Sequence, residues 1–102
     1  MIRSPEHLAL HRHKIPALRA YPFVCVLQAP VAEGAERIVC PVVPGDLRGP
    51  TTPRLDVEGT PHALILRQMR WLPLRALGQP VGTAEPARAD IARGIDLLLS
   101  GI

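Results

Sequence analysis

Three histidines near the N-terminus form the clearest cluster of side chains that could bind a metal ion. His7, His11 and His13 follow the spacing H-x-x-x-H-x-H. On a helix, His7 and His11 would share one face, whereas on a strand the first histidine lies too far from the other two. The segment HLALHRH alternates weakly, which predicts a strand, so we interpret the histidines as polar residues on its surface. The pattern therefore predicts no metal site and no cofactor.

The other candidates for acid–base or nucleophilic chemistry are one histidine and two cysteines. His62 could pair with Asp56 or Glu58 across a hairpin, but a surface histidine is the simpler interpretation. Cys25 and Cys40 lie inside apolar runs, which predicts buried thiols, with a disulfide across a hairpin as the alternative. The sequence contains no hydrolase, P-loop, metalloprotease or dinucleotide-binding motif. We therefore expect a protein that is not an enzyme.

Length and composition indicate one small domain that spans residues 1–102. Hydrophobic residues make up 47% of the chain, and 12 basic residues against 9 acidic ones give a net charge of +3. This mild positive charge suits an acidic peptide partner and is too small to indicate nucleic-acid binding. No apolar run reaches the ~20 residues that a membrane span needs, and the N-terminus does not resemble a signal peptide. We expect a cytoplasmic protein.

Most of the apolar runs predict strands. The segment 7–13 is followed by Tyr21–Leu27 and Arg37–Val43, which are apolar on both faces and predict a hairpin. Strands of this kind are buried on both sides, by a core and by a second layer or subunit. Arg54–Gly59 alternates, and Thr60–Leu66 follows an EGTP turn, so these two segments predict a second hairpin.

Prolines and glycines predict the connections between these strands. The segments 14–20, 44–53 and 78–82 are predicted loops, because proline and glycine interrupt regular structure there. The segment 67–77 is ambiguous. Its apolar residues suit a short helix that a proline would break, and a turn followed by a strand over 72–77 fits equally well.

The final segment is the clearest helix of the chain. We predict Thr83 as its N-cap and Gly101 as its C-terminal glycine cap. Leu97 departs from the amphipathic pattern, because it lies on the polar side in a row with Asp90 and Arg93. It is either an isolated exposed leucine or part of a contact surface. The predicted apolar face consists of Ala84, Ala87, Ile91, Ile95, Leu98, Leu99 and Ile102.

Three stretches in order resemble the CcdB family of bacterial toxins over about residues 21–102. They are YPFVCVLQAPV…RIVCPVVP, LDVEGTPHALIL…WLPLRALGQPVG and DIARGIDLLLSGI. The resemblance implies a mainly β fold, an SH3-like barrel with a five-stranded antiparallel sheet, a small second sheet and a C-terminal α-helix. It also implies a homodimer whose helices lie close to the two-fold axis.

The resemblance further implies a toxin of a type II toxin–antitoxin system, the kind associated with plasmid maintenance. Such a toxin binds the DNA gyrase A subunit through the end of its C-terminal helix. A cognate antitoxin with an acidic, disordered C-terminal segment would neutralise it, and the toxin would meet operator DNA only through that antitoxin, as a co-repressor. The positions that correspond to gyrase contacts are Pro30, Val31, Asp96, Leu99, Ser100, Gly101 and Ile102, and Asp90, Arg93 and Leu97 form a further expected partner contact.

Ser100 departs from the family pattern, which usually has Trp or Phe at this position. Losing an aromatic anchor commonly costs an interface about 2 kcal/mol, or about thirtyfold in affinity. Pro30 likewise stands where family members carry an aliphatic residue. Two alternatives therefore stay open. One is a homolog that has lost gyrase poisoning and acts only as an antitoxin-binding co-repressor, and the more remote one is a MazF-like ribonuclease, because MazF toxins share this barrel.

Overall fold

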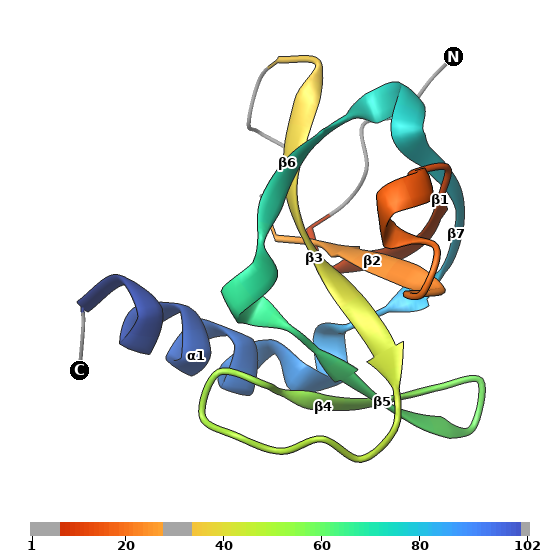
Figure 1. Cartoon of the computed structure of the whole chain (residues 1–102). Helices are drawn as coiled ribbons and strands as arrows, with labels where there is room; N and C mark the ends of the chain where they lie inside the picture. Colours follow the sequence, from red (N-terminus) through yellow and green to blue (C-terminus); the bar gives the residue numbers. More distant parts are fainter. Residues whose placement is uncertain (1–6, 28–33, 101–102) are drawn as a thin grey trace.

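The computed structural model describes residues 7–27 and 34–100, which form a curled antiparallel sheet and a C-terminal helix (Figure 1). The sheet order is β4-β5-β3-β2-β1-β7, and β6 pairs with β3 as well. The predicted fold class, mainly antiparallel β with a C-terminal helix, is confirmed. All seven strands share one sheet, whereas a five-stranded sheet and a small second sheet were expected. The strands are β1 (Ala9–His13), β2 (Phe23–Val26), β3 (Glu36–Pro44), β4 (Arg54–Val57), β5 (Thr60–Leu64), β6 (Arg70–Pro73) and β7 (Leu77–Thr83).

Short 3-10 turns join several strands, and one α-helix ends the described chain. The turns are η1 (Pro16–Leu18), η2 (Leu66–Gln68), η3 (Leu74–Ala76) and η4 (Glu85–Ala87), and the helix is α1 (Arg88–Ser100). The predicted N-cap was wrong, because Thr83 ends β7, Ala84 is the N-cap of η4 and α1 begins only at Arg88. Thr83 Oγ1 nevertheless accepts a hydrogen bond from the Glu85 N–H over 3.1 Å. No helix in the described ranges is long and apolar enough to cross a membrane.

The expectations for segments 14–20 and 78–82 were incomplete. The first contains η1, which buries Leu18. The second lies in β7, an edge strand that pairs with β1, and edge strands tolerate proline. Gly78 allows the two strands to approach closely, because a Cβ atom there would lie 3.1 Å from the Arg12 carbonyl oxygen. In the ambiguous segment, two 3-10 turns flank the short strand β6.

The second predicted hairpin is confirmed, with a two-residue turn between β4 and β5. Its residues Glu58 and Gly59 have φ values of 53° and 79°. Positive φ at both central positions is the conformation of a type I′ turn, whose twist matches that of the flanking strands.

β2 and β3 are buried on both faces, as their apolar pattern predicts. Cys25 and Cys40 face each other in register and belong to the larger core, which also includes Ile91 of α1. Val24 and Val39 belong to a smaller cluster on the other side. The chain's own elements supply both layers. The cysteines are free, buried thiols, and the hydrogen bond with Cys25, together with burial, raises the pKa of the Cys40 thiol.

Candidate functional site

The C-terminal half of α1 extends beyond the sheet (Figure 1). Ile91 and Gly94 are buried, Ile95 and Leu98 are half-buried, and Leu99 is 78% exposed. Leu99, which we predicted on the apolar face, is therefore not buried. The helical pattern correctly placed the apolar stripe, but the sheet does not continue far enough to cover the stripe to its end.

Three of the predicted gyrase-contact residues meet at this projecting end. Asp96, Leu99 and Ser100 are all exposed. Spacings of three and four residues bring Leu99 and Ser100 next to Asp96 on a helix surface. We call these three residues the helix tip. The other expected contacts, Pro30, Val31, Gly101 and Ile102, lie outside the described residues.

The row formed by Asp90, Arg93 and Leu97 lies on another side of α1. Arg93 Nη2 contacts Asp90 Oδ1 at 2.5 Å, and Leu97 is half-buried. All three line a hollow of about 320 Å³ between α1 and the loop from Arg48 to Arg54. We call this hollow the α1 groove. Leu97 is thus no isolated exposed leucine, and the loop that shields it contributes several residues to the same surface.

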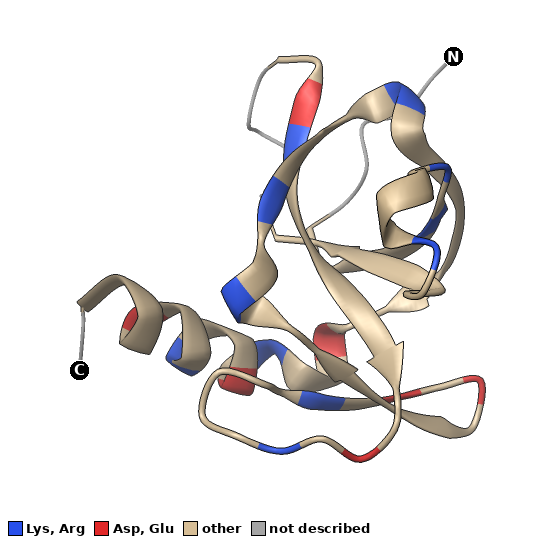
Figure 2. Ribbon diagram, viewed as in Figure 1, with Lys and Arg blue, Asp and Glu red and all other residues tan. Residues whose placement is uncertain are grey.

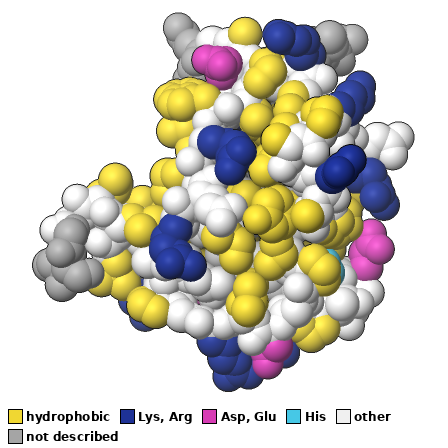
Figure 3. Space-filling model, viewed as in Figure 1, with side chains coloured by type: hydrophobic (Ala, Val, Ile, Leu, Met, Phe, Trp, Pro, Cys, Tyr) yellow, Lys and Arg dark blue, Asp and Glu magenta, His cyan; other side chains and the backbone are white. Residues whose placement is uncertain are grey.

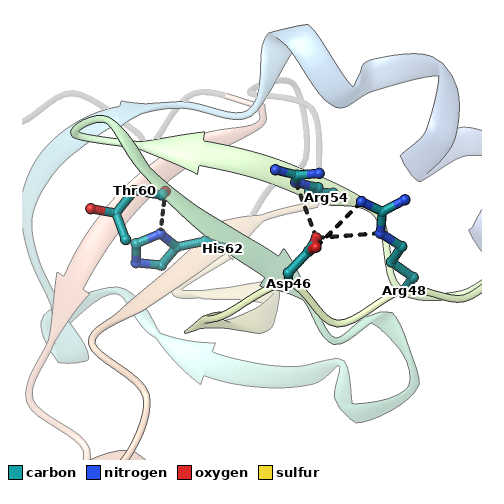
Figure 4. A network of polar contacts seen from close by, with 5 residues as sticks. All are labelled: Asp46, Arg48, Arg54, Thr60 and His62. Carbon is teal, nitrogen blue, oxygen red and sulfur yellow. Dashed lines mark hydrogen bonds and ion pairs between the residues drawn. The ribbon is translucent and has the colours of Figure 1, made fainter.

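Arg48 of the loop, Arg54 at the start of β4 and Arg93 of α1 line the α1 groove. Figure 2 shows basic positions on the ribbon of α1 and of the neighbouring loop and strand. The Asp46 carboxylate accepts hydrogen bonds from Arg48 and lies 3.3 Å from Arg54 Nε (Figure 4). The hydrogen bond from Arg48 holds the pKa of Asp46 below its ordinary value. We did not predict these residues as functional, because proline and glycine led us to interpret segment 44–53 only as a connection. The indication available in the sequence was an acidic residue, Asp46, two positions before a basic one, Arg48, which favours an ion pair in this loop.

A second surface missed by the sequence analysis lies on β6. Trp71 is 56% exposed and stands opposite Ile38 of β3. It borders a hollow together with Glu36 and Arg75. Hydrophobic side chains gather over this part of the sheet, with arginines among them (Figure 3). Trp71 is the only tryptophan of the chain, and that rarity was the signal that could have identified it.

The histidines have structural contacts. His11 Nδ1 lies 3.0 Å from the Gly78 carbonyl oxygen, and His13 Nε2 lies 2.6 Å from that of Tyr21. A carbonyl oxygen only accepts, so each of these ring nitrogens carries the proton. Both His11 and His62 are buried, which corrects the expectation of surface histidines. In the part of the chain that the structure describes, no three metal-ligating side chains gather into a group.

His62 pairs with no carboxylate among the described residues. Its Nδ1 donates to the Thr60 carbonyl oxygen over 2.8 Å (Figure 4), and its ring lies 5.8 Å from that of Phe23. The register of the hairpin explains the difference, because Leu55, rather than Asp56, stands opposite His62. Strand alternation therefore places His62 and Asp56 on opposite faces of the sheet.

The fold is that of small toxins from toxin–antitoxin systems. A mycobacterial endoribonuclease, solved in complex with its cognate antitoxin, superposes with a TM-score of 0.79 at 11% identity, over 95% of this chain and 96% of that one. The toxin MazF-mt6 of Mycobacterium tuberculosis superposes with a TM-score of 0.76 at 16% identity, over 90% and 96%. At these identities, the likeness concerns the fold. No curated protein matches the chain.

Sequence assigns the family within this class. The family described as CcdB protein matches residues 8–101. The chain therefore belongs to the CcdB family of toxins from toxin–antitoxin systems. This confirms the resemblance noted in the sequence and supports an antitoxin as a partner.

Proposed function

We propose that this toxin binds the A subunit of DNA gyrase through the helix tip and traps the enzyme on cleaved DNA. The observation that carries the proposal is the projecting end of α1, where Leu99 is 78% exposed. A leucine this exposed adds nothing to the core, and a surface helix that offers an apolar side chain beside an acidic and a hydroxyl group suits a protein partner. The toxin acts in the cytoplasm by binding rather than by catalysis.

A plasmid-cleavage assay tests this proposal. Supercoiled plasmid, gyrase and ATP are incubated with the purified toxin and then treated with detergent and protease. Trapped gyrase leaves linear DNA, and a gyrase A subunit altered at its toxin-binding surface should leave none. Expression in a gyrase-bearing bacterium should also arrest growth.

Two outcomes would contradict the proposal. Growth arrest with degraded RNA and intact plasmid would indicate a ribonuclease. Expression without growth arrest, with antitoxin binding retained, would indicate a co-repressor that has lost gyrase poisoning.

A homodimer through β6, rather than through the C-terminal helices as the resemblance implies, completes the proposal. β6 pairs with β3, its exposed Trp71 projects beside half-buried Ile38, and an edge strand with an apolar face is a surface that a second copy can cover. In the assembled toxin, the antitoxin contacts the dimer, and operator DNA is bound through the antitoxin alone.

Replacing Trp71 with glutamate should weaken this dimer. A tryptophan at the centre of an interface commonly contributes 2 kcal/mol or more, so we expect the dimer dissociation constant to rise by about thirtyfold. Sedimentation velocity across a concentration series measures it. Leu47→Glu is the matched control, because Leu47 is 53% exposed on a loop away from β6. Equal sedimentation of both variants and the parent protein would rule out this face.

A further inference from the structure

We propose that a basic patch around the turns η1 and η3 binds single-stranded nucleic acid. The patch consists of Lys14, Arg19 and Arg75, and Tyr21 lines the hollow beside it. These turns lie away from the projecting end of α1 (Figure 1). The inference therefore concerns a second surface, and it does not depend on gyrase binding.

The charges of this protein are divided between two regions. The ion pairs among the described residues all involve the loop after β3, the strand β4, the turn η4 or the helix α1. Residues 7–27 and residues 59–84 each contain three lysine or arginine residues and no aspartate or glutamate. These two segments meet where β1 pairs with β7. Figure 2 shows basic positions around β1, η1 and η3, with no acidic position on these elements.

Backbone contacts bring the three cations of the basic patch together. The Lys14 N–H donates to the Ala76 carbonyl oxygen over 2.9 Å, which places Lys14 next to Arg75. Lys14 and Arg19 line one hollow of about 370 Å³. All three cations are exposed, and none belongs to an ion pair among the described residues. Like charges this close repel one another, so a polyanion is the favoured partner.

The hollow beside the basic patch is held open by hydrogen bonds of the chain itself. His13 Nε2 donates to the Tyr21 carbonyl oxygen over 2.6 Å, and His13 Nδ1 accepts from the Ile15 N–H over 3.2 Å. Leu18 is buried and anchors η1 between these contacts. Because both ring nitrogens are engaged, His13 is not free to act as a general base. We therefore expect the patch to hold a strand without cleaving it.

The walls of the hollow favour an unpaired base. Tyr21 is half-buried and lines the hollow together with Pro16 and Pro22. An unpaired base can pack against an aromatic wall of this kind while its flanking phosphates contact the cations. The bases of a duplex are stacked and paired with one another, so they cannot enter the hollow. A peptide rich in carboxylates would satisfy the cations but leave the aromatic wall uncovered.

Neutralising one cation of the basic patch tests the inference against a closely matched control. Arg19→Gln removes a charge from the patch, whereas Arg67→Gln removes the same charge from η2, which packs near α1. Both arginines are exposed, and neither belongs to an ion pair among the described residues. The probe is a short oligouridylate with a fluorescein label, and fluorescence anisotropy measures its binding.

We expect Arg19→Gln to weaken binding about fivefold at about 0.1 M salt and to lower the slope of log affinity against log salt by about 0.7, the effect of one phosphate contact in a single strand. Arg67→Gln should bind within about twofold of the parent protein, because salt screens a distant charge. Tyr21→Leu should weaken binding at least about fivefold, since leucine remains apolar but offers no ring for stacking.

Four results would overturn the inference. They are equal binding by Arg19→Gln and Arg67→Gln, no binding by the parent protein, equally tight binding of a duplex of the same length, and shortening of the oligouridylate during the measurement. Gyrase is absent from this assay, so a failure of the gyrase proposal would appear only in the plasmid-cleavage assay.

Discussion

Replacing Gly94 with leucine should lower the free energy of unfolding by about 2 kcal/mol. A Cβ atom at this position would lie 2.5 Å from Leu66 Cδ1 and 3.1 Å from the Pro50 carbonyl oxygen. Leu66 is fully buried, and the Pro50 oxygen belongs to the backbone, so neither can move freely. Overpacking of this kind costs ~1–3 kcal/mol or more, which outweighs the ~1 kcal/mol that helix propensity gains when glycine is replaced.

Urea unfolding measures the change, and a fall in melting temperature of roughly 10 °C should accompany it. Ala92→Leu is the control, because Ala92 is exposed on the same helix and the substitution should change stability by no more than ~0.5 kcal/mol. A Gly94→Leu variant as stable as the parent protein would mean that the loop at Pro50 does not press against α1. That result would also remove the evidence for a defined groove between this loop and α1.

Replacing Leu99 with glutamate should weaken binding to the gyrase A subunit by about thirtyfold. Residues that carry interface energy commonly contribute 2 kcal/mol or more, and the substitution puts a charge where the proposed contact is apolar. Stability should stay within ~0.5 kcal/mol of the parent protein, because the side chain is 78% exposed. Surface plasmon resonance with immobilised A subunit, together with the plasmid-cleavage assay, separates these two effects.

Ser100→Trp should strengthen binding to the gyrase A subunit, because an aromatic side chain would add apolar contact area that the serine at the helix tip does not provide. About tenfold tighter binding is expected, which corresponds to ~1.4 kcal/mol. Leu47→Glu, a change at another exposed leucine, should leave gyrase binding as it is. If Leu99→Glu and Leu47→Glu bound equally well, the helix tip would not be the contact surface.

The fold was largely predictable from the sequence, and the exceptions have physical causes. Apolar runs identified β2 and β3 because both strands are covered on two sides, and the two-residue turn at Glu58 and Gly59 defined the second hairpin. β7 was missed because glycine and proline ordinarily interrupt strands. At the sheet edge, Pro80 loses no ladder hydrogen bond, and Gly78 permits the close approach to β1.

The site was only partly predictable, because surface features depend on which segments meet. The periodicity of α1 correctly separated Leu97 from the buried stripe, but it could not show that a loop more than forty residues earlier covers this leucine. The same periodicity placed Leu99 on the apolar face, but it could not show that Leu99 stays exposed, because a helical pattern carries no information about where the sheet ends. Trp71 became a candidate for a contact surface only because the structure shows β6 as a strand on which the Trp71 side chain is exposed.

The burial of both thiols has a practical consequence for measuring these interactions. Cys25 and Cys40 have no exposed surface, and the hydrogen bond with Cys25, together with burial, raises the pKa of the Cys40 thiol. Maleimide dyes react with accessible thiolates. A single cysteine engineered at an exposed surface position would therefore take up a fluorophore selectively in the native protein, without replacement of either natural cysteine.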